Sequence, residues 1–282
     1  VFFMKSAPFF SWNIHKNKDI FPIIKELAIT EDVDILMLAE YPECMEEELL
    51  KAINEEPSLY KYQYVPSNSP TDKVKIFTRF DISFISNSND RNRLSAKQLF
   101  STLLNKNITL ITCHLPSKIN MTDDELSEYS TEVAEFIEEV EQQVGHQRTI
   151  ICGDFNMNPF DKGMIKARGL HSVMDKSVIN NNGKATVRGN EYEFLYNPMW
   201  GFLGDTGKGK VSGTMYYNSS KSINFYWHIY DQVLIRPELI DFFDDSLLDI
   251  ITRINQKQLV TSNFVIDKQY SDHLPIKFNL KI

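Results

Sequence analysis

The segment CGDFNMNP, residues 152–159, follows a run of apolar residues and then turns abruptly polar. Asp154 and Asn156 lie two positions apart, just after Gly153, and both side chains can bind a metal ion or a phosphate group. An Asn/Asp/Gly cluster of this kind is also typical of an ordinary Asx-turn. The segment therefore allows two interpretations, a structural turn or half of an active site.

Polar residues flank other apolar runs of the chain in the same way. Four runs end on polar residues and two later runs begin just after them: Asn13, Glu40, His114, Asp154 with Asn156, Asp231, and Asp272 with His273. If the two later strands run antiparallel to the earlier ones, all these residues gather at one edge of the sheets. Each residue alone has an ordinary explanation, such as a cap, a solvated strand end or a core histidine. Their joint occurrence favours a site built on rigid strand ends.

Length and composition indicate a globular protein with a sizeable core. The chain has 282 residues, of which 42% are hydrophobic and 24% charged, which is ordinary for a soluble protein and allows one large domain or two small ones. No apolar run approaches the ~20 residues of a transmembrane helix. A net charge of −8 weakens the idea of a broad basic face that coats nucleic acid.

Hydrophobic periodicity predicts a mixed α/β fold. Apolar stripes at helical spacing predict helices over 19–29, 43–54 and 123–144, the last with Thr122 and Glu125 as a capping box. Short β-type runs lie between them: PFFSW, VDILMLA, KVKIF, DISFI, NITLITC, RTIIC, DQVLI and LPIKFNL. Strands interleaved with helices, some separated only by turns, favour mixed sheets. Residues 180–222 are rich in Gly, Asn and Lys, so we expect long loops that shape substrate choice.

The cysteines and the N-terminal segment bear on the cellular compartment. Three cysteines, Cys44, Cys113 and Cys152, argue against a disulfide framework and fit no zinc spacing. Cys113 and Cys152 lie in apolar runs and are expected to be buried, inert thiols. The start, VFFMKSAPFF, lacks a secretory pattern. We therefore expect a cytoplasmic protein, although a signal that had been removed would leave the same appearance.

The motifs SWN at 11–13, GDFN at 153–156 and SDH at 271–273 together resemble those of the endonuclease/exonuclease/phosphatase superfamily. Its members include deoxyribonuclease I, AP endonucleases, neutral sphingomyelinases and inositol-polyphosphate 5-phosphatases. The resemblance covers essentially the whole chain and implies one catalytic domain over residues 1–282. It also implies a four-layered α/β sandwich with two central mixed β-sheets flanked by helices, and one metal-dependent site for phosphate ester hydrolysis.

The resemblance assigns roles to the polar residues of the first motifs. Glu40 is the expected ligand of Mg²⁺ or Mn²⁺, with Asn13 and Asp272 completing the surroundings of the ion, because hard cations prefer oxygen ligands. Asp154 is expected to orient or deprotonate the attacking water. Asn156 is expected to donate to a phosphoryl oxygen without adding negative charge.

The histidines receive roles in the same way. His273 is expected to meet phosphate as an imidazolium that Asp231 orients and keeps charged. His114, in CHLPS, resembles the histidine of the deoxyribonuclease I and sphingomyelinase branch that contacts phosphate or serves as an acid. Arg93 is a candidate phosphate contact, and Asp72 is a candidate to orient His114.

Three functions remain open at this point. We expect a divalent-metal-dependent phosphodiesterase, a nuclease that hydrolyses DNA or RNA by in-line water attack. The first alternative is a phosphatase or phospholipase C-type hydrolase of an inositol phosphate, a nucleotide or sphingomyelin, for which NPMWGFLG at 197–204 is the candidate apolar loop. The second is a non-catalytic scaffold of the same fold. His15 and His228 lie near the motifs, and we expect structural or loop roles for them; no protein partner follows from the sequence.

Overall fold

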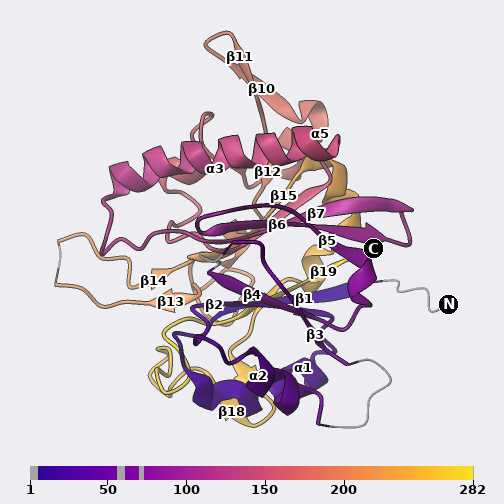
Figure 1. Cartoon of the computed structure of the whole chain (residues 1–282). Coiled ribbons are helices and arrows are strands. Elements are labelled where there is room, and N and C mark those ends of the chain that lie inside the picture. The colour runs from indigo at the N-terminus through magenta and orange to yellow at the C-terminus, as the bar shows by residue number, and fades with distance from the viewer. Residues whose placement is uncertain (1–5, 56–60, 70–72, 221, 282) are drawn as a thin grey trace.

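Two large mixed β-sheets form the centre of the molecule (Figure 1). The computed structural model describes residues 6–55, 61–69, 73–220 and 222–281. The first sheet has the order β16 (Asp249–Ile250), β19 (Ile276–Leu280), β1 (Ala7–Asn13), β2 (Ile35–Ala39), β4 (Val74–Thr78) and β3 (Gln63–Val65). The second has the order β5 (Ile85–Arg91), β6 (Leu94–Ser101), β7 (Lys106–His114), β8 (Thr149–Asp154), β15 (Asp231–Ile235), β12 (Leu195–Tyr196) and β9 (Ser172–Val173).

Helices cover the outer face of each sheet, which gives four layers (Figure 1). Helix α3 (Asp123–Val144) packs Val133 and Phe136 against Ile151 of the second sheet. Helices α1 (Phe21–Thr30) and α2 (Glu46–Ile53) lie on the far side of the first sheet. A larger apolar core, which includes Phe9 and Ile150, joins the inner faces of the two sheets. The four-layered sandwich predicted from the sequence is confirmed.

The two later strands run antiparallel to the earlier ones, which is the arrangement that would gather the polar residues at one edge. β1 runs parallel to β2, and β7 runs parallel to β8. β19 is antiparallel to β1, and β15 is antiparallel to β8. The ends of the earlier strands and the beginnings of the later ones therefore lie at the same edge.

Helix α3 begins and ends where local signals predict. The Thr122 hydroxyl accepts from the Glu125 backbone N–H at 3.2 Å, and the Glu125 carboxylate accepts from the Thr122 N–H at 2.7 Å. Gly145 ends the helix in a left-handed conformation with φ 74°. The two shorter helices begin two or three residues later than predicted, α1 because the short 3₁₀ turn η1 (Lys18–Ile20) precedes it.

Two predictions about local structure were wrong. The run DISFI is mostly the 3₁₀ turn η2 (Ile82–Phe84), because the Asp81 carboxylate accepts from the Ser83 N–H at 2.9 Å, and strand β5 begins only at Ile85. The prediction of long loops was wrong for part of the region 180–222, where, among the described residues, only residues 203–214 form a long irregular stretch. The region contains the end of α5 (Lys176–Asn182), the hairpin of β10 (Lys184–Val187) and β11 (Asn190–Glu193), strand β12, the 3₁₀ turn η3 (Pro198–Phe202) and strand β13 (Met215–Tyr216).

The remaining elements are short and lie outside the two central sheets. They are α4 (Lys162–Ile165), β14 (Trp227–His228), η4 (Pro237–Phe242), η5 (Asp245–Leu247), β17 (Arg253–Ile254) and β18 (Lys257–Gln258). Cys113 and Cys152 are buried free thiols, as predicted, and Cys44 is exposed. No helix in the part of the chain that the structure describes combines the length and apolar character of a membrane span.

Gly153 allows β7 and β8 to approach closely just before the polar segment. Its φ is +146°, and a Cβ atom built on it would lie 1.9 Å from the Cys113 carbonyl oxygen. Gly153 and Cys113 are partners in the parallel pairing of the two strands. A side chain at this position would force the strands apart, so the glycine is required by the packing of the backbone.

We expect Gly153→Ala to lower the free energy of unfolding by about 3 kcal/mol or more, because the added methyl group meets backbone that cannot move aside. Gly145→Ala is the matched control, since Gly145 is also at positive φ but has nothing within 4 Å of the added atom, and it should cost only roughly 1 kcal/mol. Urea denaturation followed by circular dichroism measures both. Equal losses in the two variants would contradict the steric explanation.

Candidate active site

Strand ends from both sheets bring the predicted polar residues together. His114 and Asp154 are the last residues of β7 and β8 and are paired in register, and Asp231, the first residue of β15, is paired with Asp154. From the first sheet, Asn13 ends β1, Glu40 directly follows β2, and Asp272 with His273 precedes β19. The site therefore spans the boundary between the two sheets.

The two oxygens of the Asp154 carboxylate have different partners. Oδ1 accepts from the backbone N–H of Asn156 at 2.9 Å, which is the Asx-turn. Oδ2 accepts from Asn13 Nδ2 at 3.1 Å and lies 3.8 Å from His114 Nε2 and 3.9 Å from His273 Nε2. The side chain is only 1% exposed. The segment 152–159 is thus a turn and a part of the polar cluster at once, because one carboxylate serves both.

His273 and Asp231 form a buried ion pair. His273 Nδ1 lies 2.7 Å from Asp231 Oδ2. Burial by itself would lower the pKa of His273, but the carboxylates of Asp231 and Asp154 outweigh this effect and raise that pKa. Burial raises the pKa of the Asp231 carboxyl, and the adjacent imidazolium opposes this shift. The imidazole of His273 is consequently charged at neutral pH, with Nε2–H facing Asp154.

His114 presents the opposite case. Its Nε2 lies 3.6 Å from Glu40 Oε1, and its Nδ1 is buried with no hydrogen-bond partner among the described residues. Burial lowers the pKa of His114, although Asp154 and Glu40 partly oppose it, and this shift favours the neutral imidazole. Asp72, the residue predicted to orient His114, lies outside the described residues.

Glu40, Asn13 and Asp272 provide the oxygen-rich part of the cluster. Asn13 Nδ2 donates to Glu40 Oε1 at 3.2 Å as well as to Asp154. Asp272 Oδ1 is buried and, within the described part of the chain, accepts no hydrogen bond. Carboxylates from separate elements and one orphaned carboxylate oxygen suit a hard divalent cation. A second group of potential ligands, Asp154, Asp231 and His273, is described better as the ion pair and its neighbour, since His273 already bonds Asp231.

Asn156 and Arg93 lie at the same edge but are engaged with backbone carbonyls. Asn156, at φ 51°, donates from Nδ2 to the Leu115 carbonyl at 3.0 Å, which leaves one N–H of its amide for another acceptor. Arg93 Nη1 donates to the His114 carbonyl at 3.1 Å. The structure therefore places both residues beside the cluster without directing either one at Asp154 Oδ2.

Three residues that the sequence motifs did not single out support the cluster. Ser271 Oγ donates to the Asn13 carbonyl at 2.6 Å and accepts from the His273 N–H, so it joins the first motif to the last. Thr214 Oγ1 accepts from the Asp231 N–H at 3.1 Å. The indole N–H of Trp12, which is fully buried, donates to the His273 carbonyl. Ser271 and Trp12 lie inside the motifs SDH and SWN, whereas Thr214 carried no visible signal.

His15 lies within the cluster, whereas the sequence indicated only a structural or loop role for it. Its Nδ1 is 3.6 Å from Glu40 Oε2 and 3.4 Å from Asp272 Oδ1. The signal that could have found it is its position two residues after Asn13, whose side-chain oxygen accepts from the His15 N–H at 3.1 Å.

A hairpin of β13 and β14 forms one wall beside the site. Met215 of β13 bridges to His273, and the ring of His228 on β14 lies 3.1 Å from Asn158 Nδ2. The connection between these strands exposes large apolar side chains, Ile223, Phe225 and Tyr226. The candidate apolar loop NPMWGFLG does not protrude in this way, because Pro198, Met199 and Phe202 of η3 are buried. That prediction was wrong.

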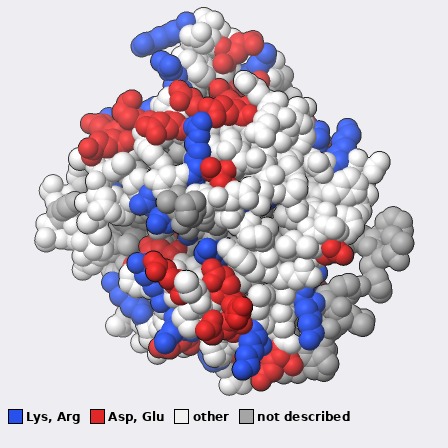
Figure 2. All heavy atoms as spheres, in the orientation of Figure 1, with Lys and Arg blue, Asp and Glu red and all other residues white. Residues whose placement is uncertain are grey.

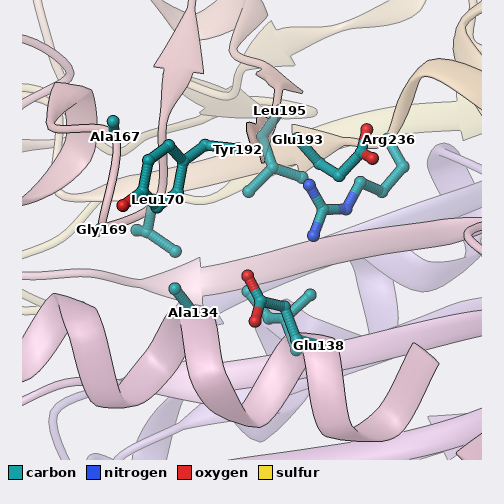
Figure 3. Close-up of a pocket in the computed structure, with 10 residues that line it drawn as sticks. Ala134, Glu138, Ala167, Gly169, Leu170, Tyr192, Glu193, Leu195 and Arg236 are labelled. Atoms are coloured by element: carbon teal, nitrogen blue, oxygen red, sulfur yellow. The ribbon is translucent and has the colours of Figure 1, made fainter. Parts of the chain in front are cut away.

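A small pocket elsewhere is separate from this cluster (Figure 3). Glu138 of α3, Glu193 and Arg236 line it. Arg236 follows β15 at the end opposite to Asp231, which is about 16 Å away by strand length. Its guanidinium is already paired with Glu141 at 2.9 Å, so Arg236 does not offer a free positive charge to a ligand.

Comparison with known proteins identifies the fold. No family model and no curated protein sequence matches the chain. It is similar to the endonuclease/exonuclease/phosphatase family protein from Leptotrichia buccalis C-1013-b, with 13% identity, a TM-score of 0.59 and coverage of 98% of this chain and 100% of that chain. It is also similar to the endonuclease domain of TRAS1, a telomere-specific non-LTR retrotransposon, with 16% identity, a TM-score of 0.55 and coverage of 98% of this chain and 99% of that chain. An AP endonuclease from Archaeoglobus fulgidus is similar as well, with 14% identity, a TM-score of 0.55 and coverage of 98% of this chain and 100% of that chain. At such identities the similarity shows the fold alone, which is that of the endonuclease/exonuclease/phosphatase proteins.

We expect Asp231→Asn to lower the pKa of His273 by about 1 to 3, because the neutral amide no longer offsets the burial of the imidazolium. A titration of the imidazole ¹⁵N shifts by NMR, on protein freed of divalent ions with EDTA, measures this. His146, which precedes β8 at its opposite end, is the internal control and should keep its pKa. An unchanged His273 titration would show that Asp231 does not hold the charge.

Proposed function

We propose that this chain is a divalent-metal-dependent phosphodiesterase whose substrate is a nucleic acid. The observation that supports this most is the convergence of an amide and two histidines from both sheets around Asp154 Oδ2. Hydrolysis of a phosphodiester requires an activated water, positive charge near the phosphoryl oxygens and a stabilised leaving oxygen. The cluster contains a group suited to each requirement.

Glu40, Asp272 and Asn13 would hold the divalent ion, Mg²⁺ or Mn²⁺. When bound, the ion would neutralise charge on the phosphoryl and leaving oxygens. The Glu40 side chain is 28% exposed, so it is accessible from solvent. Asn13 now directs its amide nitrogen at two carboxylates and its oxygen at the His15 N–H. Asn13 would supply an oxygen ligand only after its side-chain amide rotates so that the oxygen and nitrogen exchange places.

Asp154 is the residue that would orient the attacking water. Its Oδ1 is held in the Asx-turn, so only Oδ2 faces the space between the histidines. A water that donates to Oδ2 would have one lone pair directed away from the carboxylate, toward a phosphorus atom. The remaining amide N–H of Asn156 can donate to a phosphoryl oxygen without adding negative charge.

The two histidines would act in different protonation states. Their distances from Asp154 Oδ2, 3.8 and 3.9 Å, are too long for direct hydrogen bonds. Neither histidine is therefore bonded directly to Asp154, and a water or a phosphoryl oxygen can bridge Asp154 Oδ2 and the ring nitrogens. His273, held charged by Asp231, would donate from Nε2 to the phosphoryl group. His114, whose neutral form is favoured by burial, would accept or relay a proton.

The preference for a nucleic acid is supported by the second histidine and by similar structures that are named as endonucleases. The surface sets a limit on how such a substrate binds. Acidic side chains gather over α3 on the face that Figure 2 shows, and Lys and Arg are dispersed among acidic residues. Among the described side chains, this face offers no broad basic tract. On this face a nucleic acid would therefore meet no broad basic surface formed by the described side chains.

We expect the wild-type protein to hydrolyse bis-p-nitrophenyl phosphate and a nucleic-acid panel with Mg²⁺ or Mn²⁺ and to be inactive in EDTA. Asp154→Asn and His273→Gln should each lower kcat by about 10²–10⁴-fold, because each removes a group that acts on the reacting atoms. His146→Gln, a substitution at the opposite end of β8, is the matched control and should leave kcat unchanged.

Two outcomes would count against this function. If the wild-type protein hydrolysed none of the substrates with either ion, the non-catalytic scaffold would be favoured. If Asp154→Asn and His273→Gln both retained the wild-type kcat, the catalytic roles proposed for these two residues would be wrong. Circular dichroism of each variant excludes loss of folding as the cause of a lower rate.

A phospholipase C-type activity on a lipid phosphate is the second candidate. The apolar side chains exposed between β13 and β14 favour it, because Ile223, Phe225 and Tyr226 lie on the hairpin that also contacts His273 through Met215. Exposed apolar side chains that gather on one segment indicate contact with a partner or a membrane surface. A nucleic acid would instead use the aromatic rings of the same hairpin for stacking.

For a lipid substrate, we expect the double variant Ile223→Ser/Phe225→Ser to lower the ratio of sphingomyelin-vesicle turnover to bis-p-nitrophenyl phosphate turnover by more than tenfold, since vesicle docking loses apolar area. For a nucleic-acid substrate, wild-type turnover of vesicles should be negligible. An assay of phosphocholine release from the vesicles, run beside the nucleic-acid panel, distinguishes the two candidates.

A further inference from the structure

The backbone at the ends of β1 and β2 directs His15 toward the acidic part of the cluster. His15 and Glu40 have φ values of 49° and 46°. These values lie in the left-handed region, which residues other than glycine and asparagine rarely adopt. Hydrogen bonds from Ile14 N to the Ala39 carbonyl and from Lys16 N to the Glu40 carbonyl continue the pairing of the chains past the strand ends. Two strained residues held in register indicate a functional constraint on where their side chains point.

The His15 imidazole lies between two carboxylates that come from different parts of the chain. Nδ1 is 3.6 Å from Glu40 Oε2 and 3.4 Å from Asp272 Oδ1. Adjacent ligand atoms held at about 2.1 Å from one octahedral ion lie about 3 Å apart. Both distances are longer than this, so the imidazole nitrogen and the two carboxylate oxygens would have to move closer together to share one ion. The His15 side chain is 63% exposed, so it is free to move in this way.

A second observation indicates that the cluster lacks a cationic partner. Asp272 Oδ1, which lies 3.4 Å from His15 Nδ1, is buried and accepts no hydrogen bond from any residue that the structure describes. Glu40 Oε2 faces His15, while Oε1 faces Asn13 and His114. A buried carboxylate oxygen without a partner is costly, and a bound cation would satisfy it.

We propose that His15 Nδ1 is a ligand of the divalent ion, together with Glu40 and Asp272, and that the site therefore prefers a first-row transition ion to Mg²⁺. Mg²⁺ takes oxygen ligands and loses its water reluctantly. An imidazole nitrogen adds more to the affinity for later first-row ions than to that for Mg²⁺. This inference rests on the proposed function in one respect, because the ion that His15 would bind is the same ion that would assist hydrolysis.

The test compares ion binding with and without the imidazole, on whole protein freed of metal by EDTA. Isothermal titration calorimetry with Mn²⁺ and with Mg²⁺ gives the two affinities. We expect His15→Gln to weaken Mn²⁺ binding by about 10- to 100-fold and Mg²⁺ binding by less than threefold. His15→Asp, which restores an oxygen donor, should shift the ratio of affinities toward Mg²⁺.

Pulsed electron paramagnetic resonance of the Mn²⁺ complex identifies the ligand atom. The wild-type complex should show a ¹⁴N hyperfine coupling that becomes a ¹⁵N coupling in protein labelled with ¹⁵N-histidine. His15→Gln should lose this coupling. His114→Gln is the matched control because His114 Nε2 also faces Glu40, and it should retain the coupling.

Two results would overturn the inference. If His15→Gln kept the nitrogen coupling and the Mn²⁺ affinity, the nitrogen would come from another residue or from none. If His15→Gln bound Mn²⁺ more tightly, His15 would compete with the ion instead of ligating it. The proposed function can fail separately. If the wild-type protein bound Mn²⁺ through His15 but hydrolysed no phosphodiester, the ion site would be supported and the proposed hydrolysis would be contradicted.

Discussion

The ion pair between His273 and Asp231 crosses from one sheet to the other, and the arrangement of the site depends on it. His273 precedes β19 of the first sheet, and Asp231 begins β15 of the second. Removing two charges from water costs several kcal/mol for each, and a pair of apolar side chains would join the sheets at least as well. The hydrogen bond between Asn13 and Asp154 crosses the same boundary. A charged junction at one end of an otherwise apolar interface is consistent with a requirement for chemistry and is not explained by stability.

The backbone near the site also has features that cost stability. Glu40, His15 and Asn156 have positive φ, and Gly153 permits a contact between strands that no other residue allows. Non-glycine residues in the left-handed region cost about 1–2 kcal/mol each. The apolar core between the sheets offsets this strain. As a result, the side chains at the strand ends are held in position by the fold, which would lower the entropy lost in reaching a reactive geometry in the proposed hydrolysis.

Local signals in the sequence predicted a large part of the fold. Helix α3 was predicted at both of its ends because its apolar stripe is long and its capping box is encoded within four residues. The run DISFI looked like a strand, but the Asp81 side chain competes for the backbone N–H of Ser83 and makes a turn instead. The hairpin of β10 and β11 was hidden because its glycines and asparagines are also typical of irregular loops.

The sequence by itself determined which polar residues end the strands, since an apolar run and the residue after it are visible within a few positions. Only the tertiary structure decided that His15 lies against Asp272 and that burial lowers the pKa of His114 while the pKa of His273 is raised. Such distances depend on how segments more than 250 residues apart pair in one sheet. The protonation states depend on burial and on the carboxylates that the fold brings near, and neither quantity is encoded in the order of residues along the chain.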